Sequence, residues 1–459
     1  MRAVASKSLP PFALFVGYQL GGWASNEARA EEVKDSSKAE PAILATKESS
    51  PPRLLQTHIV FRHGARTPVF WNPDLSESVD TEAFAGKCQA VNLPPGVAGS
   101  HAYPSLFRAA QLEVRDVDEK KPRRPKSVVD SFQLQAIYGE CRAGQLTTLG
   151  AEQSAKLGKD LRERYGVIAR NARADNRVWI RTSNVARCVA TLQFVLGEFF
   201  YDDDDQGRLD EEERVFVTIT APNQTEWLYP NTNCSLMAQL MFAAKEDWSR
   251  EPDPEAVEVV NKLKERVPEK TFKALRLDGY NFVRVRDYTV AYEAHGLKRP
   301  WVPEDDELAK KIEDLGAVQI ARYLYHENAS MSSVAARAGV GNLLKVFFDA
   351  ILNPTEKSPQ LSVVSAHDTT LMPILSACGA WDGSWPGFCS WVAFELWSDG
   401  KINLVFNGEV AKSFTVEEFT KLANELAPKD GEPWEAYCKR THPTLPELAK
   451  KAGVHGDHW

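Results

Sequence analysis

The chain has 459 residues, of which 43% are hydrophobic and 26% are charged. This length and composition are sufficient to bury a large core, and we predict one large domain with a smaller insertion. The formal net charge of −8 at pH 7 argues against a nucleic-acid-binding protein, because such proteins carry a basic surface.

The N-terminus has the features of a targeting peptide. Basic residues and a moderately apolar stretch, residues 9–24, precede a small-x-small cleavage site at residues 28–30. We predict a secretory signal over residues 1–30, with a mitochondrial presequence as the alternative, because Pro and Gly interrupt the apolar core. The stretch is short and poor for a transmembrane span. Residues 31–52 are rich in Glu, Lys, Ser and Pro and are interpreted as a disordered linker.

Residues 61–68 read Phe-Arg-His-Gly-Ala-Arg-Thr-Pro and follow an apolar run that predicts a buried strand. Arg62 and Arg66 can each present a planar fork of donors to phosphoryl oxygens. His63 is the candidate nucleophile, which would form a phosphohistidine that water then hydrolyses. The flanking cations disfavour the imidazolium, so His63 can stay neutral at mildly acidic pH. Gly64 is expected to let the backbone approach an anion closely. The alternative for this block is a basic surface turn.

Residues 177–184 predict a second short strand that carries Arg181 at its end. Ser183 is expected to open an amphipathic helix, which would place Arg181 beside a helix N-terminus, where anions are favoured. We therefore predict that Arg181 binds phosphate, and the alternative is a solvated surface charge. Arg187 is expected about two turns into that helix, in a structural role.

A third polar group follows the apolar run of residues 361–366. His367 can donate a hydrogen bond to a phosphate, and Asp368 is the candidate general acid that protonates the departing alkoxide oxygen. The alternative for Asp368 is an N-cap of the next helix, which is expected over residues 369–378 and to stop at Gly379. In an open α/β sheet, ligands bind beyond the carboxyl ends of strands, so the groups that follow the three strands can converge on one crevice.

Residues 202–213 form an acidic segment with the spacing of an EF-hand loop. The candidate calcium ligands are Asp202, Asp204, Gln206, Arg208 and Glu213. Gln206 stands where Asp or Asn is usual, and the following residues, 215–219, look like a strand rather than an exiting helix. A solvated acidic turn is therefore the favoured interpretation, and a calcium loop is the alternative.

The rest of the chain gives a coarser prediction. We expect helices over residues 148–165, 309–327 and 341–352, a hairpin of strands 391–397 and 401–407, and a helix opened by a capping box at Thr415 and Glu418. The seven cysteines fit either a secreted chain with a spare thiol or a reduced chain with none paired. Cys188 is expected to be a small buried hydrophobe, and no Cys-x-x-Cys pair points to zinc.

The Arg-His-Gly-x-Arg-x-Pro block, the third arginine and the His-Asp pair together resemble the histidine acid phosphatases, branch 2 of the histidine phosphatase superfamily. Further blocks resemble its lysophosphatidic acid phosphatase (acid phosphatase type 6) branch: residues 144–147, 228–231, 367–388 and 406–409. The resemblance implies an α/β fold with a mixed, mainly parallel central sheet flanked by helices. A smaller, mostly helical cap is expected as segments 69–140 and 235–340 inserted in a domain over residues 53–459.

This resemblance also implies an enzyme that hydrolyses phosphate monoesters without a cofactor or metal. The expected substrate is lysophosphatidic acid, which would give monoacylglycerol. An inositol-polyphosphate phosphatase is the first alternative, and a non-catalytic calcium-binding relative is the second. We expect a secretory or extracellular location, with a mitochondrial one as the alternative.

Overall fold

The computed structural model describes residues 51–88, 109–110, 112–116, 136–138, 141–200, 215–219, 226–230, 232–325, 329–429 and 432–440. The predicted targeting peptide, nearly all of the predicted linker and the acidic segment 202–213 lie outside these residues. No helix in the described part of the chain is long and apolar enough to cross a membrane.

The centre of the fold is an eight-stranded sheet with the strand order β10-β9-β8-β1-β7-β5-β6-β2. Its strands are β1 (Leu54–Arg62), β2 (Leu112–Asp116), β5 (Val178–Thr182), β6 (Val215–Ile219), β7 (Leu361–Ala366), β8 (Trp391–Trp397), β9 (Ile402–Phe406) and β10 (Glu409–Phe414). β1, β7, β5, β6 and β2 pair in parallel, and β8, β9 and β10 add antiparallel strands on the other side of β1. This arrangement confirms the predicted mixed, mainly parallel sheet and the predicted hairpin.

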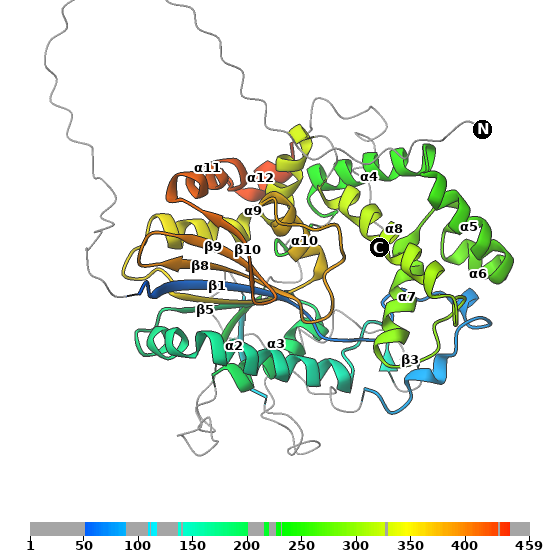
Figure 1. The fold of residues 1–459 in the computed structure, drawn as a ribbon, viewed down its shortest axis with the longest axis horizontal. Coiled ribbons are helices and arrows are strands. Elements are labelled where there is room, and N and C mark those ends of the chain that lie inside the picture. Colours follow the sequence, from blue (N-terminus) through cyan, green and yellow to red (C-terminus); the bar gives the residue numbers. More distant parts are fainter. Residues whose placement is uncertain are drawn as a thin grey trace, which may run out of the picture. The chain divides into compact units, whose positions relative to one another are not determined.

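Helices cover both faces of this sheet (Figure 1). On one face lie α2 (Thr148–Ala174) and α3 (Ala186–Phe199), whose leucines pack with Ile59 and Phe61 of β1. On the other face lie α9 (Ala329–Leu352), α10 (Asp368–Ala377) and α11 (Val416–Leu426), which pack with Val60. Because β1 contributes alternate side chains to both cores, nearly all of its residues are buried, as expected for a central parallel strand.

A second, helical core lies beyond the sheet (Figure 1). It contains α4 (Ser235–Arg250), α5 (Pro254–Arg266), α6 (Glu269–Ala274), α7 (Phe282–Ala294) and α8 (Asp306–Tyr325). The other elements within the described residues are β3 (Ala136–Tyr138), β4 (Cys141–Arg142), α12 (Trp434–Cys438) and the short 3-10 helices η1 (Pro73–Leu75), η2 (Thr81–Phe84) and η6 (Leu277–Gly279). Trp248, Phe282 and Tyr288 are buried at the centre of this helical core.

Several predicted helix boundaries are wrong. α3 begins at Ala186 rather than at Ser183, because Val185 is extended and forms an N-cap without a side-chain hydrogen bond. α2 continues to Ala174, and α9 starts a full twelve residues before the expected position. The helix after β7 starts at Asp368 with His367 as its N-cap. The capping box of Thr415 and Glu418 is confirmed.

The cysteines form two disulfides, Cys88–Cys141 and Cys234–Cys438. Cys188, Cys378 and Cys389 are free, and Cys188 is buried as expected. The odd cysteine count left two alternatives, a chain with disulfides and a spare thiol or a reduced chain without disulfides. The structure has disulfides together with free thiols.

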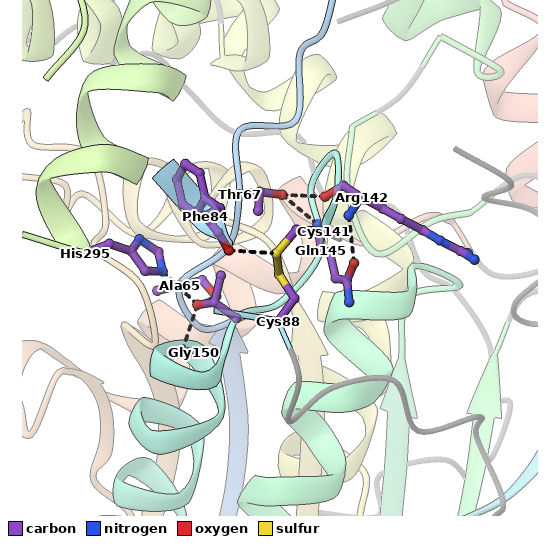
Figure 2. The surroundings of a disulfide bond; sticks show 10 residues. Ala65, Thr67, Phe84, Cys88, Cys141, Arg142, Gln145, Gly150 and His295 are labelled. Atoms are coloured by element: carbon purple, nitrogen blue, oxygen red, sulfur yellow. Dashed lines mark hydrogen bonds between the residues drawn. A yellow bond between two sulfur atoms is a disulfide. The ribbon is translucent and has the colours of Figure 1, made fainter. Parts of the chain in front are cut away.

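The disulfide of Cys88 lies beside the residues that follow β1 (Figure 2). The Thr67 hydroxyl donates to Arg142 O at 2.6 Å and accepts from Gln145 N at 3.1 Å. The backbone of Thr67 also donates to Gln145 O. The segment that starts at Cys141 is therefore bonded directly to the Arg-His-Gly-x-Arg-x-Pro block.

Gly64, the glycine of this block, packs directly against the backbone of Gly150 in α2. A Cβ atom on Gly64 would lie 2.3 Å from Gly150 O, and one on Gly150 would lie 2.1 Å from Ala65 O. Neither distance is possible for a real side chain, so the two glycines let the start of α2 touch the block. At Gly64 the backbone therefore approaches α2 closely, and the expected approach to an anion stays a prediction.

We expect Gly150→Ala to lower the free energy of unfolding by about 1–3 kcal/mol, because the added methyl overlaps fixed backbone atoms. Gly166→Ala, in the same helix, is the matched control, since its Cβ would lie 3.6 Å from the nearest side-chain atom. That substitution should raise helix stability by up to about 1 kcal/mol. Denaturant unfolding of both variants measures the difference, and equal stabilities would contradict the assigned contact.

Candidate active site

Two neighbouring strands deliver the central residues of the site. β1 and β7 run parallel, with Arg62 opposite Ala366 in register. His63 and His367 follow directly, and His63 N donates to Ala366 O at 3.2 Å. The two imidazole rings lie 5.6 Å apart between centroids, in an edge-to-face arrangement. The carboxyl ends of parallel strands therefore bring together residues that are about 300 positions apart in the chain, as the strand polarity predicts.

His63 is buried and neutral. Burial lowers its pKa well below the ordinary value, and the positive charges of Arg187, Arg62 and Arg66 lower it further. Its Nδ1 lies 2.9 Å from Gly64 O. Because a carbonyl oxygen only accepts, Nδ1 carries the ring proton and Nε2 keeps its lone pair. The geometry thus leaves one ring nitrogen of His63 available as a nucleophile.

His367 is also held neutral. Burial lowers its pKa, Arg187 lowers it further, and Asp368 only partly opposes these effects. Its Nε2 lies 2.9 Å from the Ser183 hydroxyl. The Tyr229 ring contacts the imidazole edge-to-face at 4.9 Å between centroids. The residue that we expected to open α3 is therefore a hydrogen-bond partner of His367 instead.

Asp368 accepts two hydrogen bonds and forms one ion pair. Its Oδ2 lies 2.8 Å from Arg62 Nη2 and 2.7 Å from Trp385 Nε1, and its Oδ1 accepts from Thr369 N at 2.8 Å. Burial alone would raise the pKa of Asp368, but the charge of Arg62 and the indole N–H of Trp385 outweigh it and hold the pKa well below its usual range. Asp368 is the first residue of α10 rather than its N-cap.

Arg62 and Arg66 are each fixed by a carboxylate and by one aromatic ring. Besides its ion pair with Asp368, Arg62 donates to Pro386 O at 2.6 Å and lies 4.3 Å from the ring centroid of Phe388. Arg66 Nη1 donates to Asp287 Oδ1 at 2.7 Å, and its guanidinium lies 6.0 Å from the Phe388 centroid. Asp287 belongs to α7, so the helical core contributes directly to the site.

The two remaining arginines occupy different environments. Arg181 is fully buried, donates to Glu226 Oε1 at 2.8 Å and lies 4.1 Å from the centroid of Trp227. Arg187 stands in the first turn of α3 and is the cation with the largest effect on the pKa of His63 and of His367. Within the described residues, its buried Nε has no hydrogen-bond partner.

The structure therefore groups Arg187, rather than Arg181, with the two histidines. Arg187 was expected in a structural role because the start of α3 was predicted too early, at Ser183. With α3 starting at Ala186, Arg187 lies at the N-terminal turn, where a cation can face an anion bound at the helix end. Phosphate binding by Arg181 stays a prediction. The calcium prediction also stays a prediction, and within the described residues no group of three or more His, Cys, Asp or Glu side chains could hold a metal ion.

The sequence matches the family described as histidine phosphatase superfamily (branch 2) over residues 53–407. The chain belongs to this family. The predicted family and the predicted class of enzyme, a phosphoric monoester hydrolase, are confirmed.

Curated relatives of this branch 2 histidine phosphatase include acid phosphatases. Lysophosphatidic acid phosphatase type 6 of Bos taurus is 28% identical over 354 residues, which cover 75% of this chain and 74% of the relative. Testicular acid phosphatase of Mus musculus is 27% identical over 265 residues, which cover 55% of this chain and 59% of the relative. Counting factor 60 of Dictyostelium discoideum is 26% identical over 375 residues, which cover 78% of this chain and 80% of the relative.

Among solved structures, the Hafnia alvei phytase in complex with myo-inositol hexakis sulphate is similar with a TM-score of 0.52 and 12% identity. The alignment covers 84% of this chain and 99% of the phytase. The Bifidobacterium longum multiple inositol polyphosphate phosphatase with inositol hexasulfate gives a TM-score of 0.51, also at 12% identity, and covers 84% of this chain and 96% of that one. At this identity the likeness shows a shared fold and nothing about the substrate.

We expect Arg187→Ala to weaken the binding of inorganic phosphate at least about tenfold, because one charge-assisted hydrogen bond is lost. The same variant should raise the pKa of His63 and His367 toward ordinary values. Phosphate titration calorimetry and NMR titration of the imidazole rings measure the two effects.

Arg181→Ala is the matched comparison. It leaves the Glu226 carboxylate buried without its ion-pair partner, so its main effect should be a loss of stability of about 3–5 kcal/mol. A folded Arg181→Ala protein that loses phosphate affinity while Arg187→Ala keeps it would reverse our assignment of the two arginines.

Proposed function

We propose that this chain is an acid phosphatase that hydrolyses phosphate monoesters through a phosphohistidine at His63. The observation that carries the proposal is the neutral, buried imidazole of His63, with Nε2 unprotonated, among Arg62, Arg66 and Arg187. Nε2 attacks phosphorus, the ester P–O bond breaks, and Asp368 protonates the leaving oxygen. Water then attacks the phosphohistidine, and the ionised Asp368 accepts its proton.

The arginines supply most of the stabilisation that phosphoryl transfer requires. The transition state spreads negative charge over three equatorial oxygens, and planar guanidinium groups neutralise it at fixed positions. Arg62, Arg66 and Arg187 are proposed to take this role, together with a hydrogen bond from His367. Arg181 is proposed either to bind the phosphate as well or to hold the neighbouring segment in place through its ion pair with Glu226.

Because Asp368 is ionised in the free site, the proton that it gives to the leaving oxygen must come from another group. A general acid must carry a proton when the ester bond breaks. A phosphate monoester has a second pKa of about 6, so at mildly acidic pH it arrives largely as the monoanion. Its proton passes to Asp368 as the phosphate oxygens replace that carboxylate at Arg62. The proposal therefore accounts for an acidic optimum without a protonated Asp368 in the free enzyme.

We propose lysophosphatidic acid as the substrate, with monoacylglycerol as the product. The type 6 relatives support this substrate by their names. Aromatic side chains near the site support an apolar leaving group: Phe70, Trp71 and Trp385 are partly buried against the helical core, and Phe388 covers Arg62. Segments 69–140 and 235–340, apart from β2 in the central sheet and α9 against it, are proposed to form the cap that selects this leaving group.

The two disulfides support a secretory or extracellular location. Disulfides persist in oxidising compartments and are rare in the cytosol. Cys88–Cys141 and Cys234–Cys438 each join segments far apart in the chain. We therefore propose that residues 1–30 act as a secretory signal rather than a mitochondrial presequence.

We expect His63→Ala to lose at least about a thousandfold in turnover, because water cannot replace the covalent route. The folded variant should still show a rise in melting temperature with inorganic phosphate, since the arginines remain. Rapid acid-free quenching of the wild type with a labelled phosphate ester should trap a phosphoenzyme that the variant lacks. Near-normal turnover in the folded variant would exclude His63 as the nucleophile.

We expect kcat/KM to rise with the acyl chain when glycerol 3-phosphate is compared with a series of lysophosphatidic acids below their micellar concentrations. Each buried methylene contributes about 0.8 kcal/mol, so a few contacts are enough for a tenfold preference. An inositol phosphate and an aryl phosphate complete the panel. A flat response to chain length, or a preference for the inositol phosphate, would contradict the lipid substrate and leave the phosphatase chemistry intact.

A further inference from the structure

Trp385 and Arg62 both contact the same carboxylate oxygen of Asp368, and Arg62 is one of the arginines proposed to bind the phosphate. The indole Nε1 of Trp385 donates to Oδ2 at 2.7 Å, and Arg62 Nη2 lies 2.8 Å from the same oxygen. Oδ1 is occupied by Thr369 N at 2.8 Å. When a phosphate oxygen takes the Arg62 donor, the indole N–H is the side-chain donor that stays on Oδ2.

Trp385 is itself fixed from the helical core. The guanidinium of Arg286, on α7, lies 3.7 Å from its ring centroid. Arg286 Nη2 donates in turn to Glu313 Oε1 of α8 at 2.7 Å, and Arg286 is only 4% exposed. An indole held between a cation and a carboxylate has little freedom to rotate. The orientation of the Asp368 carboxyl group therefore depends on two helices that carry none of the motif residues.

We propose that Trp385 is the positioning residue for the general acid, and that Arg286 and Glu313 hold it in place. This inference rests on the proposed function of Asp368. The indole occupies one lone pair of Oδ2, and once phosphate replaces the carboxylate at Arg62 the other lone pair carries the proton taken from the ester monoanion. As the P–O bond breaks, this O–H bond breaks too, and the proton ends on the leaving alcohol. The carboxylate that remains is again stabilised by Trp385 and Arg62.

The charges around Asp368 determine the sign of the expected pH effect. The charged and titratable groups that act on it are Arg62, Arg66, Arg187, Arg286, His367 and Cys188. The Trp385 hydrogen bond lowers the pKa of Asp368 together with these arginines. Removing this donor raises the pKa of the acid, so Asp368 stays protonated to a higher pH. The descending, alkaline limb of the kcat profile should then move upward in pH.

Trp385→Phe tests the inference, with Trp381→Phe as the matched control. Trp381 lies in the same loop, is half-buried against the same core and donates its Nε1 to Ser384 O rather than to Asp368. Both variants are assayed across pH on glycerol 3-phosphate, which has a poor leaving group, and on p-nitrophenyl phosphate, which has a good one. Asp368→Asn gives the reference for complete loss of the acid.

For Trp385→Phe we expect kcat on the alkyl ester to fall at least about tenfold and on the aryl ester less than about threefold, because only the alkoxide needs a proton. The alkaline limb for the alkyl ester should rise by about half a pH unit or more. Inhibition by inorganic phosphate should stay within about threefold of wild type, since the arginines are unchanged. Trp381→Phe should match wild type in all three measurements.

Equal losses on the two esters, or a Trp385→Phe profile identical to that of Trp381→Phe, would overturn the inference. If Trp385→Phe does not fold, Glu313→Gln loosens Arg286 without altering the loop, and it should give a smaller loss with the same alkyl-over-aryl selectivity. No selectivity there would also overturn the inference. Failure of the proposed function looks different, because the wild type would then hydrolyse neither ester or His63→Ala would remain active.

Discussion

The site depends on burying several positive charges beside two neutral imidazoles. Burial and the neighbouring cations lower the pKa of Arg62 to about 10, although Asp368 opposes this effect. Unpaired buried cations would destabilise the fold strongly, and the carboxylates of Asp368 and Asp287 offset the charges of Arg62 and Arg66 inside the protein. If Arg62 and Arg66 bind phosphate as proposed, the same carboxylates compete with it for the guanidinium groups. The free site is therefore a set of ion pairs that a phosphate anion can replace.

These carboxylates also connect the two cores of the protein. Asp368 belongs to the helix that follows β7, whereas Asp287 belongs to α7 in the helical core. Asp287 Oδ2 accepts from the backbone N–H of Val69 at 2.7 Å and of Phe70 at 3.1 Å, while Oδ1 holds Arg66. One aspartate thus fixes both an arginine that is proposed to bind phosphate and the chain that follows the Arg-His-Gly-x-Arg-x-Pro block. A change in the packing of α7 can therefore reach Arg66 through the side chain of Asp287.

Site residues that directly follow buried strands could be placed from the sequence. Site residues whose positions depend on tertiary packing could not. His63 and His367 could be brought together because apolar runs mark β1 and β7, and parallel strands end at one edge. Arg187 could not be placed, since the start of α3 depends on the extended backbone at Val185 rather than on a capping side chain. The Trp385 contact with Asp368 has no periodic signal in the sequence. The helical core was anticipated as a smaller, mostly helical cap, and the helix predicted over residues 309–327 corresponds to α8.

Neutral buried histidines give the fold a definite response to acid. The folded-state pKa values of His63 and His367 lie well below the unfolded value of about 6.5, so the unfolded chain binds more protons than the folded chain as the pH falls below that value. The stability that these residues contribute is complete above pH 6.5 and is lost progressively as the pH falls toward the folded-state pKa values. A bound phosphate anion works in the opposite direction, because it stabilises the folded state by mass action and its charge offsets that of the arginines. An enzyme built in this way is least stable without ligand at the acidic pH where its substrate arrives as the monoanion, so the anion that is the substrate also restores the stability of the site.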